Sequence, residues 1–208
     1  MKTQNTLTQL ELARQGVISD KMKQAAATEN IDPEILRQRI AEGTAIICHN
    51  NKHTNGIPLA VGKGLRTKVN ANIGTSKDDT SIDKELEKAR VAVAAGADAI
   101  MDLSTGGPID EIRAAIISET TACIGSVPLY QAAVDTVTRK GKAMVDMTAD
   151  EIFDGIIKHL EDGVDFITVH CGVTRATAER LDKEGRIMEA ASRGGSFTVG
   201  WMPPNHAQ

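Results

Sequence analysis

Five short apolar runs in this chain of 208 residues each end in a cluster of polar residues and glycines, at 70–74, 101–107, 127–131, 168–172 and 192–196. Polar groups at the carboxyl ends of successive parallel strands form the ligand sites of α/β proteins. The segment 192–196, Ser-Arg-Gly-Gly-Ser, suits an anion best. Its glycines let backbone N–H groups approach an anion closely, and Arg193 offers a bidentate charged clamp. A glycine turn with a solvated arginine explains these five residues equally well.

Two other clusters hold side chains that could take part in catalysis or binding. His170 ends an apolar run, so it could move a proton or hydrogen-bond a substrate, although a purely structural histidine fits equally well. Cys171 fits a small strand-end residue better than a nucleophile, because no basic group adjoins it. The glycines after Asp102 and Ser104 precede a helix opened by Pro108, where a phosphate could bind. The favoured interpretation is that these short polar side chains satisfy local backbone groups.

The remaining histidines and cysteines give little support for a metal site. His49 and His53 have the spacing of two ligands on a helix, but the surrounding asparagines and glycines indicate a loop, which argues against a metal. Cys48, Cys123 and Cys171 occur singly, without a C-x-x-C pair. The chain therefore encodes neither a zinc ribbon nor a local iron–sulfur motif.

Composition excludes several classes of protein. The net charge is −4 and no basic stripe stands out, which argues against nucleic acid as a partner. No apolar run approaches the ~20 residues that span a bilayer, and the N-terminus lacks the apolar segment of a signal peptide. We expect a cytoplasmic protein without a membrane partner. Only five residues are aromatic, so the core must be aliphatic.

The elements that position the clusters follow from start and stop signals. A helical lead-in is predicted, with helices beginning at Thr6, Ser19 and Asp32, then a strand over 45–48 and a polar loop over 49–58.

From residue 65, strand and helix patterns alternate, which predicts right-handed βαβ units and a parallel sheet. One strand is predicted before Gly74, and others over 97–101, 124–127, 166–169 and 197–201; residues 187–191 lead into the last cluster. Five helices are predicted: one over 81–95, one that begins at 108, one that ends near 141, one from the capping box of Thr148 and Glu151 to Gly163, and one that begins at Thr174. We expect about five strand–helix units of an α/β barrel or doubly wound fold.

Five ordered motifs and the lead-in segment 8–16 together resemble the phosphomethylpyrimidine synthase family; the motifs lie at 68–74, 101–106, 127–132, 168–173 and 192–195. The resemblance covers about residues 6 to 202 and implies a (β/α)8 barrel of which this chain is an N-terminal portion. Residues 1–60 would then form the lead-in and loop, and residues 61–208 the first part of the barrel.

The resemblance also implies an activity. The family enzymes are homodimeric carbon–carbon lyases of an atypical radical S-adenosylmethionine type, which make the thiamine pyrimidine. They rearrange 5-aminoimidazole ribotide into hydroxymethylpyrimidine phosphate, using a 4Fe-4S cluster to reduce S-adenosylmethionine. Carried over by motif, the substrate-binding residues are Asn72, Met101, Tyr130, His170, Ser192, Arg193 and Gly194. The Ser-Arg-Gly turn would hold the phosphate, and Tyr130 and His170 would orient the imidazole and ribose.

The sequence departs from the family after Trp201. The family has two later histidines that bind a divalent metal such as zinc, and a C-x-x-C-x-x-x-x-C motif that binds the cluster; neither occurs here. We therefore expect a polypeptide that is inactive alone. Unpaired strands at the edges of a partial barrel would make it prone to associate.

Three alternatives stay open. The related 5-hydroxybenzimidazole synthases, which make the lower ligand of cobamides, use the same substrate and share these motifs. A phosphate-binding aldolase or isomerase would use Lys68 as its strand-borne Schiff-base residue. A non-catalytic fragment that retains the ribotide pocket is the third.

Overall fold

The computed structural model describes residues 7–203, beginning with the predicted helical lead-in. The lead-in helices are α1 (Gln9–Arg14), α2 (Asp20–Glu29) and α3 (Pro33–Ala41). The helix start expected at Thr6 lies outside the described residues, and the observed capping box joins Thr8 to Glu11. Ser19 and Asp32 cap α2 and α3 as predicted, because each side chain accepts a backbone N–H of the first turn.

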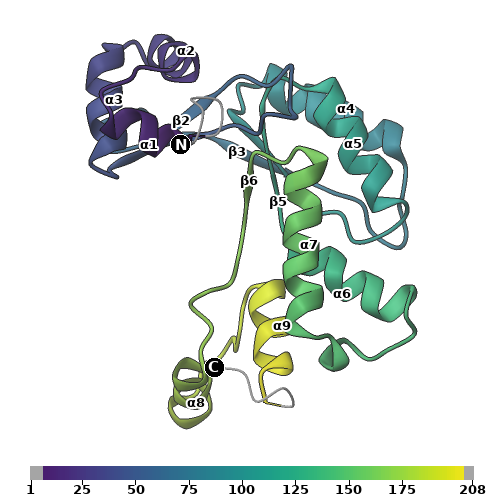
Figure 1. Cartoon of the computed structure of the whole chain (residues 1–208). Helices are drawn as coiled ribbons and strands as arrows, with labels where there is room; N and C mark the ends of the chain where they lie inside the picture. The colour runs from purple at the N-terminus through teal and green to yellow at the C-terminus, as the bar shows by residue number, and fades with distance from the viewer. Residues whose placement is uncertain (1–6, 204–208) are drawn as a thin grey trace.

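A two-stranded antiparallel sheet follows the lead-in helices. The predicted strand over 45–48 is confirmed as β1 (Ala45–Cys48), and it pairs with β2 (Leu59–Gly62), a strand that the sequence pattern did not predict. The apolar sides of α1–α3 and of this pair share one core, which includes Met22, Leu36 and Ala60. The lead-in is therefore a small packed unit, seen in purple and blue at one end of Figure 1.

The predicted parallel sheet is present, with strand order β3-β4-β5-β6. Its strands are β3 (Asn70–Ile73), β4 (Ala99–Asp102), β5 (Cys123–Ser126) and β6 (Phe166–Ile167), and the helices between them are α4 (Ile82–Ala94), α5 (Ile109–Glu119), α6 (Pro128–Thr138) and α7 (Ala149–Asp162), with a short 3-10 turn, η2 (Met144–Asp146), between the last two. The capping box of Thr148 and Glu151 is confirmed at α7. This mixed architecture fits the expected partial α/β barrel with a helical start.

The two faces of the sheet differ in what they contact. Side chains alternate along a strand, so residues in register on neighbouring parallel strands share a face. One face, including Ile73, Ile100 and Ile124, packs on α4 and α5 in an aliphatic core. The other face carries Asn72 and Met101, which are paired in register.

The C-terminal part departs from the predicted pattern. The strand expected over 197–201 is wrong, because these residues belong to α9 (Arg193–Trp201). Residues 187–190 form turns and bends, and β6 is shorter than predicted. The cause of the first error is the Ser192 side chain, which accepts the N–H of Gly195 and starts a helix. β-Branched and aromatic composition had suggested a strand there, and local capping overrides it.

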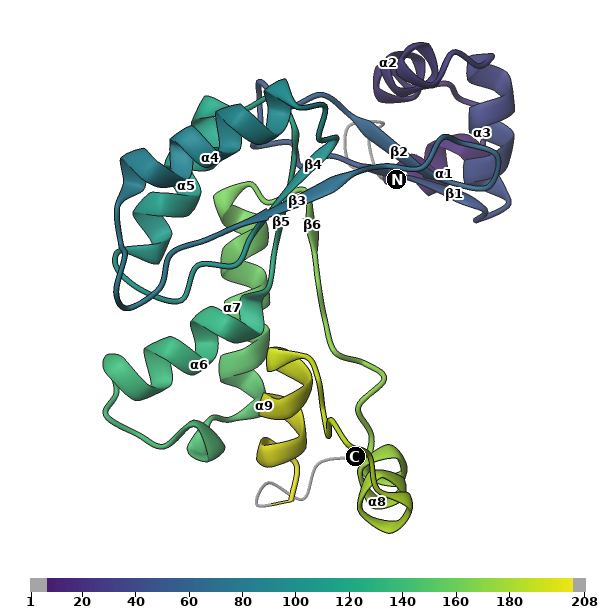
Figure 2. The same ribbon diagram turned by 180° about the vertical axis from the view of Figure 1, so that it is seen from behind.

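Helix α8 (Arg175–Glu184) is capped by Thr174 as predicted. In both views α8 and α9 lie at the end of the molecule opposite the lead-in helices, and an extended segment joins β6 to α8 (Figures 1 and 2). Among residues 7–203, no helix is long and apolar enough to cross a membrane.

Candidate functional site

Asn72 and Met101 occupy neighbouring strands at the carboxyl half of the sheet. Asn72 of β3 is in register with Met101 of β4, and Met101 with Gly125 of β5. Asn72 is exposed, and its side-chain oxygen accepts a hydrogen bond from Asn70 Nδ2 at 2.9 Å. Met101 is buried beside it. The sheet therefore presents one amide with a free donor group next to an apolar surface.

Tyr130 lies in the first turn of α6, directly after β5. Its backbone N–H donates to the carbonyl of Val127, which closes this turn behind Pro128. The Arg193 guanidinium carbon lies 5.3 Å from the centre of the Tyr130 ring. Such a cation over an aromatic face is attracted by the ring's negative potential. The contact joins α6 to the first turn of α9.

Asn72, Tyr130 and Arg193 line one open hollow of about 620 Å³. Its other polar lining residues are Thr75 and Ser76 from the loop after β3, Lys88 from α4 and Thr105 from the loop after β4. Three of the seven candidate residues therefore meet in one place, although they come from widely separated parts of the sequence. Lys88 is paired with the buried carboxylate of Glu85 at 2.5 Å, so the positive charge that favours an anionic ligand in this space is that of Arg193.

His170 and the start of α9 form a second contact region. A Cβ built on Gly194 would lie 2.0 Å from His170 Cε1, so only glycine lets α9 pack against this ring. His170 Nδ1 is buried without a hydrogen-bond partner. His170 lines a mostly apolar hollow of about 400 Å³ together with Phe197 and Trp201. Ser192 serves as the cap of α9, so the expected Ser-Arg-Gly turn is a helix N-terminus.

The cluster after β4 serves mainly to join two loops. Asp102 Oδ1 accepts from both the N–H and the hydroxyl of Ser104, at 3.0 and 2.5 Å. Ser104 Oγ in turn accepts the N–H of Thr75. Asp102 faces the helices, and burial raises its pKa. The interpretation that these side chains satisfy local backbone groups fits this arrangement.

His53 is fully buried, and both of its ring nitrogens have hydrogen-bond partners within the chain. Its Nδ1 donates to Asp165 Oδ2 at 2.7 Å and its Nε2 to the carbonyl of Thr120 at 3.0 Å. Both partners can only accept, so both ring nitrogens carry protons. Burial alone would lower the pKa of His53, but the hydrogen bonds to Asp165 and Thr120 outweigh it and raise that pKa. His49 bonds only the carbonyl of Gly56, at 3.0 Å.

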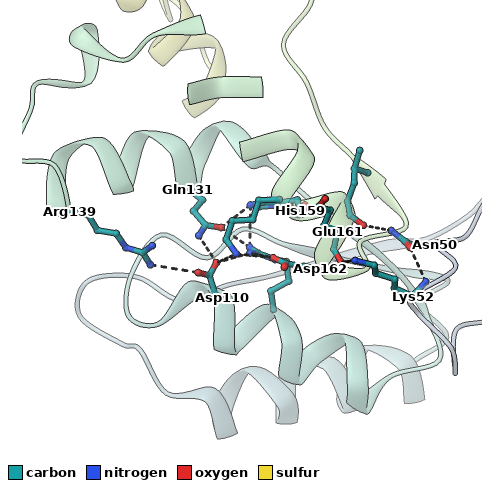
Figure 3. A network of polar contacts seen from close by, with 12 residues as sticks. Asn50, Lys52, Asp110, Gln131, Arg139, His159, Glu161 and Asp162 are labelled. Carbon is teal, nitrogen blue, oxygen red and sulfur yellow. Dashed lines mark hydrogen bonds and ion pairs between the residues drawn. The ribbon is translucent and has the colours of Figure 1, made fainter. Parts of the chain in front are cut away.

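Asp165 connects the lead-in loop to the parallel sheet. Besides His53, it accepts the N–H groups of Asn50 and Ile124, each at 2.7 Å. Burial acts to raise the pKa of Asp165, but these hydrogen bonds outweigh it and lower the pKa. Asn50 Nδ2 also donates to the carbonyls of Leu160 and Val164, at the end of α7 (Figure 3).

A second buried network was missed by sequence reasoning. Arg113 of α5 is fully buried and donates to Asp110, Asp162 and Gln131. Asp110 lies on α5, Gln131 on α6 and Asp162 on α7, and Figure 3 shows their side chains meeting. Asp110, on the same helix as Arg113, accepts from its guanidinium at 2.8 Å. The signal was available, because Arg113 lies four residues after Ile109 and four before Ile117, which places it on the apolar face of its helix.

His159 extends this network to the sheet. Gln131 Nε2 donates to Asp110, so Gln131 Oε1 faces His159 Nε2 at 2.8 Å, and Arg113 Nη1 lies 3.2 Å from the same ring nitrogen. His159 Nδ1 is hydrogen-bonded to the hydroxyl of Ser126, the last residue of β5, at 2.8 Å. Burial and the nearby charge of Arg113 lower the pKa of His159 to about 3. The ring is therefore neutral and supports the sheet from its helix-covered face.

Lys68 is unsuited to a Schiff base at this site. Its ammonium pairs with the buried carboxylate of Glu29 at 2.6 Å. Lys68 also precedes β3, which begins at Asn70, and therefore lies at the amino end of the strand. The hollow lies at the carboxyl end. The aldolase alternative loses its candidate residue.

The parallel sheet and the polar hollow at its carboxyl edge define an α/β protein of the partial-barrel type. Residues 8–208 match the Radical SAM ThiC family, and the chain belongs to that family. It is 82% identical over 202 residues to "Phosphomethylpyrimidine synthase 2" of Syntrophotalea carbinolica, covering 97% of this chain and 47% of that protein. The phosphomethylpyrimidine synthase of Geobacter metallireducens is 74% identical over 201 residues, with 97% and 46% covered. That of Pyrococcus furiosus is 48% identical over 196 residues, with 94% and 46% covered. The chain spans about half the length of these relatives.

Proposed function

We propose that this chain forms the ribotide-binding part of a phosphomethylpyrimidine synthase, the thiamine-pathway lyase that converts 5-aminoimidazole ribotide to hydroxymethylpyrimidine phosphate. The observation that carries the proposal is the hollow shared by Asn72, Tyr130 and Arg193. These residues belong to three separate family motifs, and they meet at the edge of the sheet where α/β proteins bind ligands.

Each candidate residue has a role that its chemistry suits. The Arg193 guanidinium and the first N–H groups of α9, at Ser192 to Gly194, would hold the phosphate, since a helix N-terminus favours an anion. The Asn72 amide and the Tyr130 hydroxyl would bond the imidazole and the ribose. His170, with its unpartnered Nδ1, would accept or donate one further hydrogen bond to the ligand. Met101 would form the apolar floor.

The family's radical chemistry needs a 4Fe-4S cluster, which supplies the electron that cleaves S-adenosylmethionine. The cysteines described here do not fit such a cluster. Cys123 begins β5 and lies 3.9 Å from the Cys48 carbonyl, whereas Cys171 follows the carboxyl end of β6. No group of three or more metal-binding side chains converges among residues 7–203. We propose that the cluster and zinc ligands lie in the part of the family chain that this sequence does not span, and that this chain is inactive alone.

Further proposals concern the organisation of the protein. Residues 1–60 would form the lead-in and 61–208 the barrel portion. In the described sheet β3 and β6 each pair with one neighbour only, so their other edges are available to a further part of the chain or to a second subunit of a homodimer. We place the protein in the cytoplasm, because its reductive chemistry requires a reducing compartment.

Calorimetric titration of the 208-residue chain with 5-aminoimidazole ribotide tests the proposal. We expect saturable binding that weakens at least about tenfold in Arg193→Gln, because a charged hydrogen bond to phosphate contributes about 1.5–3 kcal/mol. Arg180→Gln is the matched control, since Arg180 is exposed on α8 and pairs with Glu184 of the same helix. Equal binding by the parent chain and R193Q would exclude the proposed phosphate site. Turnover by the purified, cluster-reconstituted chain would contradict its inactivity.

The proposal does not separate the thiamine enzyme from a 5-hydroxybenzimidazole synthase, which acts on the same ribotide. The names of the relatives favour the former. Product analysis with a full-length protein that contains this sequence distinguishes the two. Ribotide binding without turnover by the present chain is the result expected of a binding portion in either case.

A further inference from the structure

Two side chains one helical turn apart on α9 contact the Tyr130 ring. Arg193 lies over the ring at 5.3 Å from its centre. Phe197 approaches the same ring edge-on, with the ring centres 6.2 Å apart and the planes at 72°. Residues four apart lie on one face of a helix, so α9 contacts Tyr130 through a single continuous face.

Phe197 occupies the boundary between the polar and apolar regions next to the site. It lines the apolar hollow that contains His170, and also a groove of about 440 Å³ that continues from Tyr130 and Arg193 along α6. The next turn of α9 is anchored separately, because Trp201 Nε1 donates to the carbonyl of Met147 at 2.5 Å. Phe197 is therefore held in place by its own helix while it touches Tyr130.

We infer that Phe197 is a positioning residue for the phosphorylated ligand. The inference rests on the proposed function and adds to it a residue outside the family motif. An edge-on ring fixes the rotation of its partner, because the positive edge of one ring faces the negative face of the other. When the rotation of the Tyr130 ring is fixed in this way, the ring face that Arg193 contacts orients its guanidinium toward the hollow before any ligand binds. Less conformational freedom is then lost on binding.

Phe197 acts on the ligand through Arg193, so it affects binding of the phosphate more than binding of the rest of the ligand. Without the Phe197 ring, Tyr130 rotates more freely and Arg193 samples more orientations. Affinity for 5-aminoimidazole ribotide then falls, whereas affinity for the unphosphorylated riboside changes little. A residue that only stabilises the fold would weaken both ligands alike.

The test compares Phe197→Leu with Phe197→Tyr, which keeps the ring, and with Phe153→Leu as a matched control. Phe153 of α7 is 63% exposed and lines the apolar hollow only. Calorimetry gives the affinities for the ribotide and the riboside. Tyr130 is the only tyrosine of the parent chain, and F197L and F153L keep it so, which lets ring-labelled tyrosine report the Tyr130 ring signals of these three proteins by NMR without ambiguity. The ring current of Phe197 shifts these signals, and the shift measures the contact directly.

We expect F197L to lose this ring-current shift and to weaken ribotide binding about 2- to 10-fold, the range of an aromatic pair. F197Y should match the parent chain in ribotide affinity, and F153L in both ribotide affinity and the Tyr130 signals. If circular dichroism shows that F197L is unfolded, Phe197→Met, which fills a similar volume without a ring, replaces it. Unchanged ribotide affinity in F197L, or an equal loss for the riboside, would overturn the inference alone. Failure of the parent chain to bind the ribotide would instead overturn the proposed function, and the inference with it.

Discussion

Asp165→Asn is expected to destabilise the chain more than any surface substitution, because this carboxylate joins the lead-in to the sheet. The side chain is 2% exposed and accepts three hydrogen bonds, from the protonated ring of His53 and from the N–H groups of Asn50 and Ile124. An asparagine has the same shape but only one accepting oxygen. At least one of the two backbone donors is then left buried without a partner.

The size of the effect follows from these contacts. Leaving a buried donor unpaired costs about 1–3 kcal/mol, and bonds to a charged acceptor are each about 1 kcal/mol stronger than bonds to a neutral one. The His53 cation also loses its counter-ion, and breaking a buried pair in this way costs about 3–5 kcal/mol in total. Since domains of this size are stable by only about 5–15 kcal/mol, D165N should be close to unfolding.

Urea denaturation followed by circular dichroism at 222 nm measures this loss. Glu161→Gln is the control, because Glu161 is exposed near the end of α7. Its backbone carbonyl, rather than its side chain, accepts the hydrogen bond from Lys52. We expect E161Q to stay within about 0.5 kcal/mol of the parent chain. A loss below about 1 kcal/mol in D165N, with an unchanged denaturant slope, would refute the idea that Asp165 joins the two parts energetically.

Three further predictions follow from buried groups and helix packing. Burial lowers the pKa of His159 to about 3. The neutral His159 ring therefore stabilises the fold fully above the unfolded pKa of about 6.5, and this stabilisation is lost as the pH falls toward 3. In His159→Gln the free energy of unfolding should vary less over this pH range. Gly194→Ala should displace the His170 ring, seen as a changed imidazole NMR signal, because the new Cβ would lie 2.0 Å from Cε1; Gly200→Ala on the same helix meets open space and should stabilise the chain by about 0.5–1 kcal/mol in thermal unfolding. Ser104→Ala leaves a buried backbone N–H unpaired and should cost about 1–3 kcal/mol in urea denaturation, and an unchanged midpoint would contradict this role.

The parts of the fold that depend on local chemistry were predictable from the sequence. Caps such as Ser19, Asp32 and Thr148 act within three residues, so the helices after them begin where the sequence predicts. The pairing of His53 with Asp165 joins residues 112 positions apart, and no local pattern encodes it. At 197–201, composition favoured a strand while a cap upstream of it produced a helix, because strand preference depends on a neighbouring strand that this segment lacks.

The residues of the candidate site were predictable from the sequence, but the contacts that hold them in place were not. The seven positions came from motifs, whereas the structure shows that Asn72 and Met101 are held by different means from Arg193. Asn72 and Met101 are placed by sheet register and by backbone hydrogen bonds between the loops after β3 and β4. Arg193 is placed by side-chain contacts with a ring.

These two kinds of support differ in stiffness, and the difference bears on binding. Register is enforced by several backbone hydrogen bonds that break together, whereas one cation–ring contact of about 0.5–2 kcal/mol opens easily. The phosphate-binding side of the hollow is therefore its more mobile wall. A ligand that bridges Asn72 and Arg193 would order the start of α9 more than it orders β3 or β4. Ribotide addition should therefore slow amide hydrogen exchange by a larger factor at the start of α9 than in β3 and β4, each compared with the free chain.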